Sequence, residues 1–296
     1  MSQIGFIGLG IMGKPMAMNL LKAGKALMVN DLDQNAVNAL VAEGAVSATI
    51  AEIGAACDVI FTILPNGAIV KSVLLGDNGV SSTVKSNTLV VDMSSITPTE
   101  SKDCYDALQK FGVSFIDAPV SGGEPKAIDG TLAFMAGGDV AAFELAKPYF
   151  EIMGASAILV GPSGSGSVTK LVNQVIVNLN IAVVSEAFVM AAKAGADLEK
   201  VYQAIRGGLA GSTVLDAKVP LMLDRNFVPG GKLSINLKDI KNVMATAHSI
   251  DVPMPLSSQL LEILQSLKVL GHVEDDHGGI VQYFEHISGV KVSKKN

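Results

Sequence analysis

Short apolar runs alternate with segments of helical periodicity in the first half of the chain. The runs are IGFIG, ALMVND, DVIFTIL and TLVVDMS, and helical segments, the first of them at 12–23, separate them. This alternation is typical of parallel strands joined by crossover helices, and runs that are apolar throughout indicate a sheet covered on both faces. Three later runs, FIDAPVSG, AFMAGG and AILVG, predict strands that close this domain near Gly161. We therefore predict an α/β fold, with a Rossmann-type doubly wound parallel sheet over residues 1–161.

The pattern changes after Pro162, where helical periodicity follows without a strand-like run. We predict helices over 167–194, 197–207, 214–224, 236–250 and 255–270. They form an all-α C-terminal domain over 162–290, followed by a disordered tail over 291–296. A length of 296 residues also favours two domains. We expect the first turn of the long helix to line a cleft between the domains, where ligands commonly bind.

Composition excludes several classes of protein. With 49% hydrophobic and 17% charged residues the chain suits a soluble globular enzyme. A net charge of -6 without a basic stripe argues against nucleic acid as a partner. Cys57 and Cys104 lack metal-ligand spacing, and a strand that begins by Ile4 leaves no room for a signal peptide. We expect a cytoplasmic protein.

Two segments invite other readings. The apolar stretch 171–192 approaches the length of a membrane span, but Asn, Gln and Glu residues interrupt it, so we predict a buried helix of a soluble protein and no membrane partner. His272, His277 and His286 lie near the acidic run 274–276, but their spacing fits no metal motif. We interpret this region as a solvated loop leading into the last helix and predict no metal.

The segment Gly8-Leu9-Gly10-Ile11-Met12-Gly13 follows the first apolar run and opens a helix. In this context a GxGxxG pattern indicates a dinucleotide site. The first glycine allows a tight turn, the second lets the backbone approach a pyrophosphate, and the third permits close helix packing. The alternative is a glycine turn without a ligand.

Asp31 ends the second apolar run, where an acid can accept hydrogen bonds from the hydroxyls of the adenosine ribose. Its charge would repel a 2′-phosphate, and Leu32 follows it instead of an arginine that could bind that phosphate. The sequence therefore favours NAD as cofactor, with NADH preferred over NADPH. Asp31 or Asp33 could instead cap the next helix, and Asp33 suits that role better.

Polar residues end the third and fourth predicted strands. Since ligands bind at the carboxyl ends of parallel strands, we expect cofactor contacts from these segments. Several of the side chains could equally cap the helices that follow. The residues are Leu64, Pro65, Asn66, Ser94, Ser95 and Thr97.

Two further segments carry candidate chemistry. Ser121, Gly122 and Gly123 place a hydroxyl beside two unhindered amides that can hold a carboxylate or an oxyanion, although a glycine turn with a capping serine is the simpler reading. Lys170 shares one polar helix face with Asn173 and Gln174. Burial there would lower the lysine pKa and suit it to acid and base catalysis, whereas a snorkelling lysine is the alternative.

These blocks together resemble the β-hydroxyacid dehydrogenase family. The family pattern GFIGLGxMGxxMAxNL, DAPVSGG, GxGxxxKxxNN and a later KD pair is matched in order by GFIGLGIMGKPMAMNL, DAPVSGG, GSGSVTKLVNQ and NLKDIKN. The resemblance runs from about residue 3 to 288. One departure is Gln174, where many members have a second asparagine.

The resemblance implies roles for individual residues. Lys170 would be the catalytic lysine, Ser121 to Gly123 with Asn173 would hold the substrate, and Lys238 would lie near the nicotinamide. By itself Lys238 would be read as an ordinary surface lysine. NQVIVNLNIA, VYQAIRGGLAGSTVLDAK and DRNF most resemble the bacterial tartronate semialdehyde reductases within the family, which implies a small carboxylate substrate.

Other functions stay open at this point. A 3-hydroxyisobutyrate dehydrogenase would share the fold, the lysine and the cofactor, and would differ mainly in pocket shape. A non-catalytic nucleotide-binding module is also compatible with the fold, although the intact Lys170 favours chemistry. Long apolar helices in the second domain predict a homodimer or homotetramer.

Overall fold

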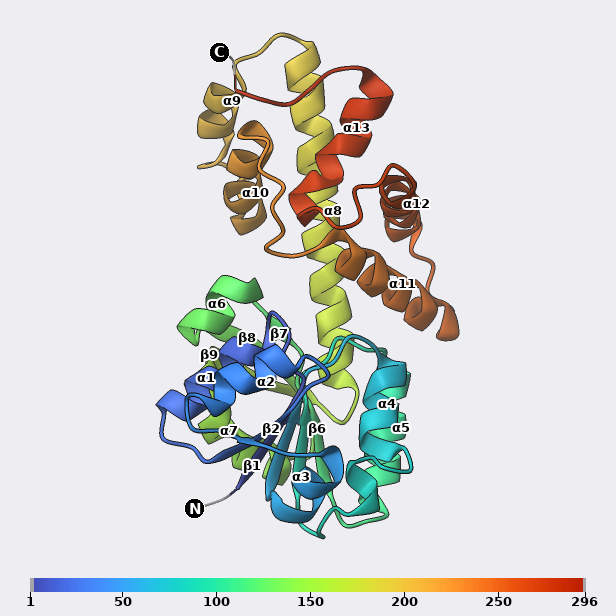
Figure 1. Ribbon diagram of the computed structural model, residues 1–296. Helices are drawn as coiled ribbons and strands as arrows, with labels where there is room; N and C mark the ends of the chain where they lie inside the picture. Colours follow the sequence, from blue (N-terminus) through green and yellow to red (C-terminus); the bar gives the residue numbers. More distant parts are fainter. Residues whose placement is uncertain (1–2, 295–296) are drawn as a thin grey trace. The chain divides into compact units, whose positions relative to one another are not determined.

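A computed structural model describes residues 3–294 and divides the chain into two compact units, Met1–Lys170 and Leu171–Asn296. The boundary falls inside one long helix, beyond the boundary that we predicted at 161/162. Each unit is described by itself (Figure 1).

The first unit is built on a nine-stranded sheet in the order β3-β2-β1-β4-β5-β6-β8-β7, with β9 paired to β8. The strands are β1 (Ile4–Ile7), β2 (Leu27–Asn30), β3 (Val46–Ser47), β4 (Val59–Thr62), β5 (Leu89–Asp92), β6 (Ser114–Asp117), β7 (Val120–Ser121), β8 (Leu132–Gly138) and β9 (Gly154–Gly161). Strands β1 to β6 pair in parallel, in the order typical of a dinucleotide-binding sheet. The doubly wound fold that we predicted is confirmed.

The pairing is antiparallel where the sheet turns at its far edge. β8 runs antiparallel to both β6 and β7, and β9 returns parallel to β8. The helix between β7 and β8 spans only Gly123–Asp129, which is too short for a parallel crossover. The runs FIDAPVSG and AFMAGG are therefore strands as expected: β6 in the first run continues the parallel order, whereas β7 and β8 do not.

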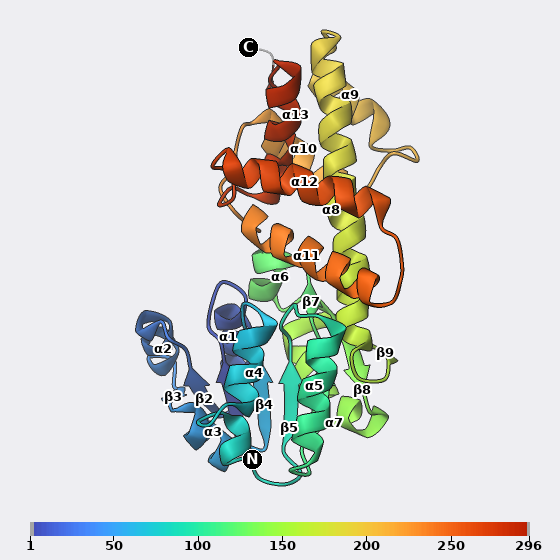
Figure 2. The same cartoon turned by 90° about the vertical axis from the view of Figure 1, so that its right-hand side faces the viewer.

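Helices cover both faces of the sheet, as the apolar strands predicted (Figures 1 and 2). Phe6, Phe61 and Val91 pack into one core with α1 and α7, while Ile60 and Val90 point into the other core with α3, α4 and α5. The helices of this unit are α1 (Gly13–Lys22), α2 (Gln34–Val41), α3 (Ile50–Ala56), α4 (Gly67–Leu75), η1 (Val80–Ser82), α5 (Pro98–Gln109), α6 (Gly123–Asp129) and α7 (Val140–Met153).

The second unit is helical in the part of the chain that the structure describes, as predicted. Its core contains large apolar side chains such as Phe188, Met222, Ile240 and Leu264. The helices are α8 (Ser165–Lys193), which begins in the first unit, α9 (Leu198–Ile205), α10 (Thr213–Leu223), α11 (Leu233–Ser249), α12 (Pro255–Val269), η2 (His277–Ile280) and α13 (Val281–Ser288).

Helix α8 is long and apolar enough to cross a membrane by length and composition alone. Ile181, Val184 and Phe188 are nevertheless buried in the core of the second unit. This is the behaviour of a core helix, as the interrupting polar residues indicated.

The expectation of a disordered tail over 291–296 is wrong for 291–294. Val292 is fully buried, and its N–H donates to the Glu285 carboxylate at 2.7 Å. Arg225 pairs with the same carboxylate, and the Lys294 N–H donates to the Leu223 carbonyl at 3.1 Å. Contacts with distant parts of the unit therefore order this segment, and residues 295–296 lie outside the described residues.

The turn between β1 and α1 contains three glycines, and its geometry requires glycine at two of these positions. Gly8 has φ +99°, and a Cβ there would lie 2.2 Å from the Ile63 carbonyl oxygen. A Cβ on Gly13 would lie 2.0 Å from the Gly8 oxygen, whereas a Cβ on Gly10 would meet no atom within 4 Å. The first and third glycines are thus required by packing, and the second borders open space.

This difference predicts that alanine at Gly13 affects stability, whereas alanine at Gly10 affects dinucleotide binding. Gly13→Ala should lower the free energy of unfolding by about 1–3 kcal/mol, because the added methyl group overpacks the turn. Gly10→Ala should change it by less than about 0.5 kcal/mol. The same Gly10 variant should weaken dinucleotide binding by about tenfold, because its methyl group stands where a pyrophosphate approaches. Denaturant unfolding and fluorescence titration measure the two effects; equal stability of both variants would contradict this account.

Candidate active site

Asp31 stands beside the glycine-rich turn, directly after β2. Its carboxylate accepts hydrogen bonds from the Leu9 N–H at 2.5 Å and from the Asp33 N–H at 2.7 Å. Asp33, and not Asp31, caps α2 by accepting from the Asn35 N–H at 2.9 Å, as we expected. Leu32 is fully exposed. The fold therefore fixes an acid next to the turn, where ribose hydroxyls are recognised in such folds.

Ser94 serves the fold at the ends of β4 and β5. Its hydroxyl donates to the Asp92 carboxylate at 2.5 Å and accepts from the Leu64 N–H at 2.8 Å. Thr62 donates to the same carboxylate at 2.7 Å. Ser94 is buried, so its hydroxyl links the two strand ends, a use that sequence reasoning did not consider.

Asn66 and Thr97 cap helices, which is the alternative that we kept open for this edge of the sheet. The Asn66 side chain accepts from the Ile69 N–H at 3.0 Å at the start of α4. Thr97 and Glu100 form a reciprocal capping box at the start of α5, with bonds of 3.2 and 2.9 Å. Cofactor contacts from this edge, including those of Pro65 and Ser95, stay a prediction.

Lys170 meets the segment that contains Ser121. The lysine is half-buried on α8, and its Nζ donates to the Val120 carbonyl oxygen at 2.9 Å. Ser121 follows at the end of β7, and Gly122 and Gly123 have φ values of +143° and +71°. Only glycine adopts such angles readily, so these two residues can turn their backbone while keeping it unobstructed. The structure thus brings together the candidate acid and the candidate oxyanion nest.

Asn173, Gln174 and Lys238 belong to the second unit and are connected through Asp239. Asn173 Nδ2 donates to Gln174 Oε1 at 2.9 Å, Gln174 Nε2 donates to Asp239, and Lys238 Nζ lies 3.1 Å from Asp239 Oδ1. An ionised carboxylate only accepts, so Asp239 turns the Gln174 amino group toward itself and the Gln174 oxygen toward Asn173. Asp239 is 1% exposed and was missed as a site residue, although the KD pair was a signal for it.

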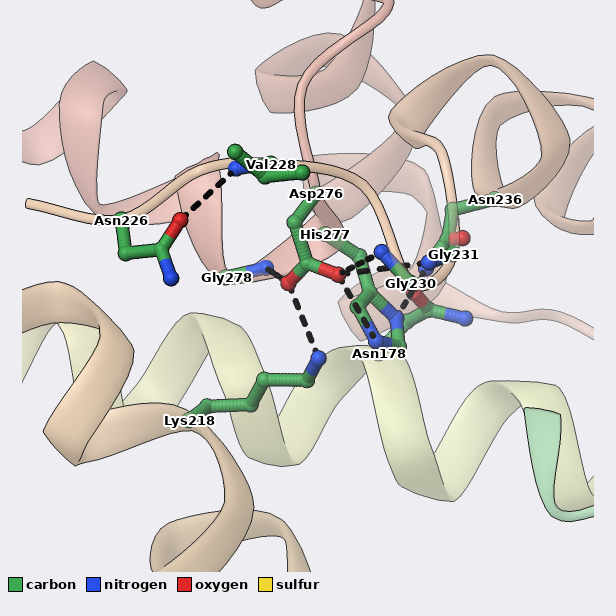
Figure 3. Close-up of polar contacts among 10 residues, drawn as sticks. All are labelled: Asn178, Lys218, Asn226, Val228, Gly230, Gly231, Asn236, Asp276, His277 and Gly278. Carbon is green, nitrogen blue, oxygen red and sulfur yellow. Dashed lines mark hydrogen bonds and ion pairs between the residues drawn. The ribbon is translucent and has the colours of Figure 1, made fainter. Parts of the chain in front are cut away.

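Buried amides continue the polar network from this point (Figure 3). Asn178 Nδ2 donates to the Gln174 carbonyl oxygen at 2.8 Å, and Asn236 donates to Asn178 Oδ1. Asn236 Nδ2 also lies 3.2 Å from His277 Nδ1. A row of polar side chains therefore runs from α8 through α11 to η2 inside the second unit.

Asp276 lies beside this network, with its Oδ2 4.0 Å from His277 Nε2, and the solvated loop that we expected here is wrong for this residue. It is buried and lies 2.9 Å from Lys218 Nζ (Figure 3). It also accepts from the N–H groups of Gly230, Gly231 and Gly278 at 3.1, 3.3 and 2.8 Å. Burial disfavours the charged form, but Lys218 and these donors hold the pKa of Asp276 below its usual value. Its function is to hold the loop before α11 in place.

The described residues contain no cluster of three or more His, Cys, Asp or Glu side chains arranged to hold a metal. Cys57 and Cys104 are free and buried. Burial raises their thiol pKa values to about 11 and about 12, so both stay protonated and unreactive near neutral pH.

Comparisons with known proteins agree with this geometry. A profile for the NAD binding domain of 6-phosphogluconate dehydrogenase matches residues 3–161. A second profile, for the NAD-binding domain of NADP-dependent 3-hydroxyisobutyrate dehydrogenase, matches 164–284. The chain therefore contains NAD(P)-binding domains.

Relatives match over nearly the whole chain. 2-Hydroxy-3-oxopropionate reductase of Escherichia coli is 41% identical over 98% of this chain and 100% of its own length. NAD-dependent L-serine dehydrogenase of Pseudomonas aeruginosa is 34% identical over 98% and 100%. A solved structure of Mycobacterium tuberculosis 3-hydroxyisobutyrate dehydrogenase with L-serine is 29% identical, with a TM-score of 0.88 over 95% of this chain and 98% of that one. This chain is an oxidoreductase that belongs to the β-hydroxyacid dehydrogenase family.

Proposed function

We propose that the chain reduces tartronate semialdehyde (2-hydroxy-3-oxopropanoate) to D-glycerate with NADH. The observation that carries this proposal is the placement of Lys170, whose ammonium group is bound 2.9 Å from the carbonyl oxygen directly before Ser121 and the two glycines. A proton donor and a nest for a carboxylate or oxyanion thereby occupy one place. The 41% identity to 2-hydroxy-3-oxopropionate reductase supports the choice of substrate.

The residues of the first unit fit a dinucleotide. The space beside Gly10 admits a pyrophosphate, and the Asp31 carboxylate is fixed by two N–H groups for hydrogen bonds with ribose hydroxyls. When bound, NADH supplies the hydride that the aldehyde carbon receives.

Lys170 then acts as the general acid. Its ammonium group donates a proton to the aldehyde oxygen as the carbon becomes tetrahedral, which yields the primary alcohol of glycerate and a neutral lysine that solvent reprotonates. Ser121 and the amides of Gly122 and Gly123 hold the substrate carboxylate and orient the aldehyde. Family resemblance assigns Asn173 and Gln174, with an orientation fixed by Asp239, to substrate binding, and Lys238 to the cofactor.

A second candidate is 3-hydroxyisobutyrate dehydrogenase activity. The solved structure of that enzyme from Mycobacterium tuberculosis superposes with a TM-score of 0.88. Methylmalonate semialdehyde, the aldehyde that this second activity would reduce, carries a methyl group where tartronate semialdehyde carries a hydroxyl. This difference changes discrimination between the two by only about 1–3 kcal/mol in an apolar pocket.

We further propose that the protein is a cytoplasmic homodimer or homotetramer. Val172, Ile176, Val183 and Met190 on α8 are each more than half exposed, at spacings of four and seven residues that place them along one side of the helix. A second copy of the chain would bury this apolar stripe. Sedimentation of the purified protein measures the state.

The substrate assignment predicts a ranking among aldehydes. NADH oxidation by the purified protein should be fastest, in kcat/KM, with tartronate semialdehyde, and slower by about tenfold or more with methylmalonate semialdehyde and succinate semialdehyde. Preference for methylmalonate semialdehyde would replace the substrate and retain the mechanism. Inactivity with all three would contradict the proposed function.

The cofactor assignment predicts a dependence on the charge of Asp31. NADH should be preferred over NADPH, and Asp31→Asn should reduce that preference by about tenfold, because the repulsion of the 2′-phosphate is removed. Asp33→Asn is the matched control, since asparagine caps α2 equally well and the NADH to NADPH ratio of kcat/KM should not change. An unchanged ratio in the Asp31 variant would exclude this acid as the determinant.

A further inference from the structure

Asp117 is a buried acid that no step above uses. It ends β6, is 1% exposed, and pairs in register with Asp92 of β5. Its carboxylate reaches the start of α8, where Oδ1 accepts from the Gly164 N–H at 2.7 Å and Oδ2 accepts from the Ser167 N–H at 2.8 Å. The first N–H groups of a helix have no partners within the helix, so one carboxylate satisfies two donors there.

β6 and the first turn of α8 pack so closely that there is no room for a side chain between them. A Cβ on Gly166 would lie 2.3 Å from the backbone oxygens of both Asp117 and Met135. A Cβ on Gly137 of β8 would lie 2.6 Å from the Gly166 nitrogen and 2.8 Å from Asp117 Oδ1. Glycines at these two positions let the first turn of α8 rest directly on the strands.

The same strand segment binds α8 a second time, one turn further on. Three residues after Asp117, the Val120 carbonyl oxygen accepts from Lys170 Nζ, and Ser121 follows at once. The position of Lys170 relative to Ser121 is therefore set by two contacts, of which the Asp117 contact fixes the backbone of the helix.

We infer that Asp117 is a positioning residue for proton transfer by Lys170: its carboxylate holds the first turn of α8 so that the ammonium group stays beside Ser121 to Gly123. The inference rests on the proposed function for its catalytic consequence. The hydrogen bonds that support it belong to the fold and are independent of the substrate.

The positioning role of Asp117 depends on its ionisation, so the catalytic rate should depend on pH. Burial raises its pKa to about 6, although the N–H groups of Gly164 and Ser167 oppose the shift. In the carboxylate form both oxygens accept, whereas protonation turns one of them into a donor that faces an N–H group. The competent form is therefore the ionised one, which is present above about pH 6 and is lost as the pH falls through that value.

The elements around the Asp117 carboxylate carry other charged and titratable groups. The elements packed around it contribute Asp92 on β5, Lys102 and Cys104 on α5, and Lys170 on α8; the Lys102 side chain comes within 3.2 Å of a Cβ built on Gly164. The Cys104 thiol stays neutral because burial raises its pKa to about 12. All four histidines lie in the second unit.

The test is the pH profile of kcat/KM for semialdehyde reduction, from about pH 5 to pH 8, in the wild-type protein and in Asp117→Asn. The wild-type activity should fall about tenfold per pH unit below pH 6. The variant should be slower by about 10- to 100-fold at neutral pH through kcat, bind NADH normally, and lack the acidic limb. A variant that keeps the wild-type limb, or a wild-type profile without one, would overturn the inference.

A further variant separates positioning from mere stability. Asp276→Asn removes a comparable buried carboxylate of the second unit and should lower stability while leaving the acidic limb in place. If Asp117→Asn does not fold, the wild-type profile decides the matter, because a profile without an acidic limb contradicts the inference.

Hydrogen exchange supplies a readout without turnover. At neutral pH, protection of the backbone amides of residues 163–170, corrected for the intrinsic rate, should be lower in Asp117→Asn than in the wild type, because asparagine offers only one acceptor oxygen to the N–H groups of Gly164 and Ser167. If the protein reduces none of the semialdehydes, the proposed function fails, but this experiment still decides the role of Asp117. Equal protection of these amides in the two proteins overturns it.

Discussion

The first unit depends on the contact between the strand segment 117–121 and the start of α8. The Asp117 carboxylate holds the N–H groups of Gly164 and Ser167, and the Val120 carbonyl holds the Lys170 ammonium group. Because the segment continues into Ser121 and the two glycines, one stretch of backbone positions both the proposed proton donor and the proposed nest. Loss of either contact would separate groups that a reaction needs within hydrogen-bond distance.

The parallel sheet supplies the other half of the chemistry. Strands that are apolar on both faces bury two cores, and their carboxyl ends leave the glycine turn and Asp31 at one edge. Several polar side chains at this edge form hydrogen bonds within the fold itself, as do those of Ser94, Asn66 and Thr97. Asp31 differs, because its fixed carboxylate stands beside a turn that borders open space at Gly10.

Sequence patterns predicted those elements that are determined by residues close together in the chain. The alternation of apolar runs and helical segments predicted the doubly wound sheet. Asp33 was correctly preferred over Asp31 as the cap of α2. The antiparallel turn at β8 was not visible, because it follows from the length of α6 rather than from any apolar run.

Residues whose environment comes from distant partners escaped prediction. Asp117, Asp239 and Asp276 look like surface acids in their own segments, and each is buried by elements 40 or more residues away. The tail was misjudged for the same reason, since Arg225 reaches the Val292 carbonyl across 67 residues. Composition at 291–296 suggests fraying, but packing decides otherwise.

Single-turnover hydride transfer is the sharpest test of the proposal that Lys170 donates the proton during reduction. Protein loaded with NADH is mixed with tartronate semialdehyde, and the decay of NADH is followed for the wild type and for Lys170→Ala. If Lys170 is the proton donor, the hydride-transfer rate should be lower by about 10²–10⁴-fold in the variant, with the dissociation constant for NADH within about twofold. A variant that transfers hydride at nearly the wild-type rate would contradict the account.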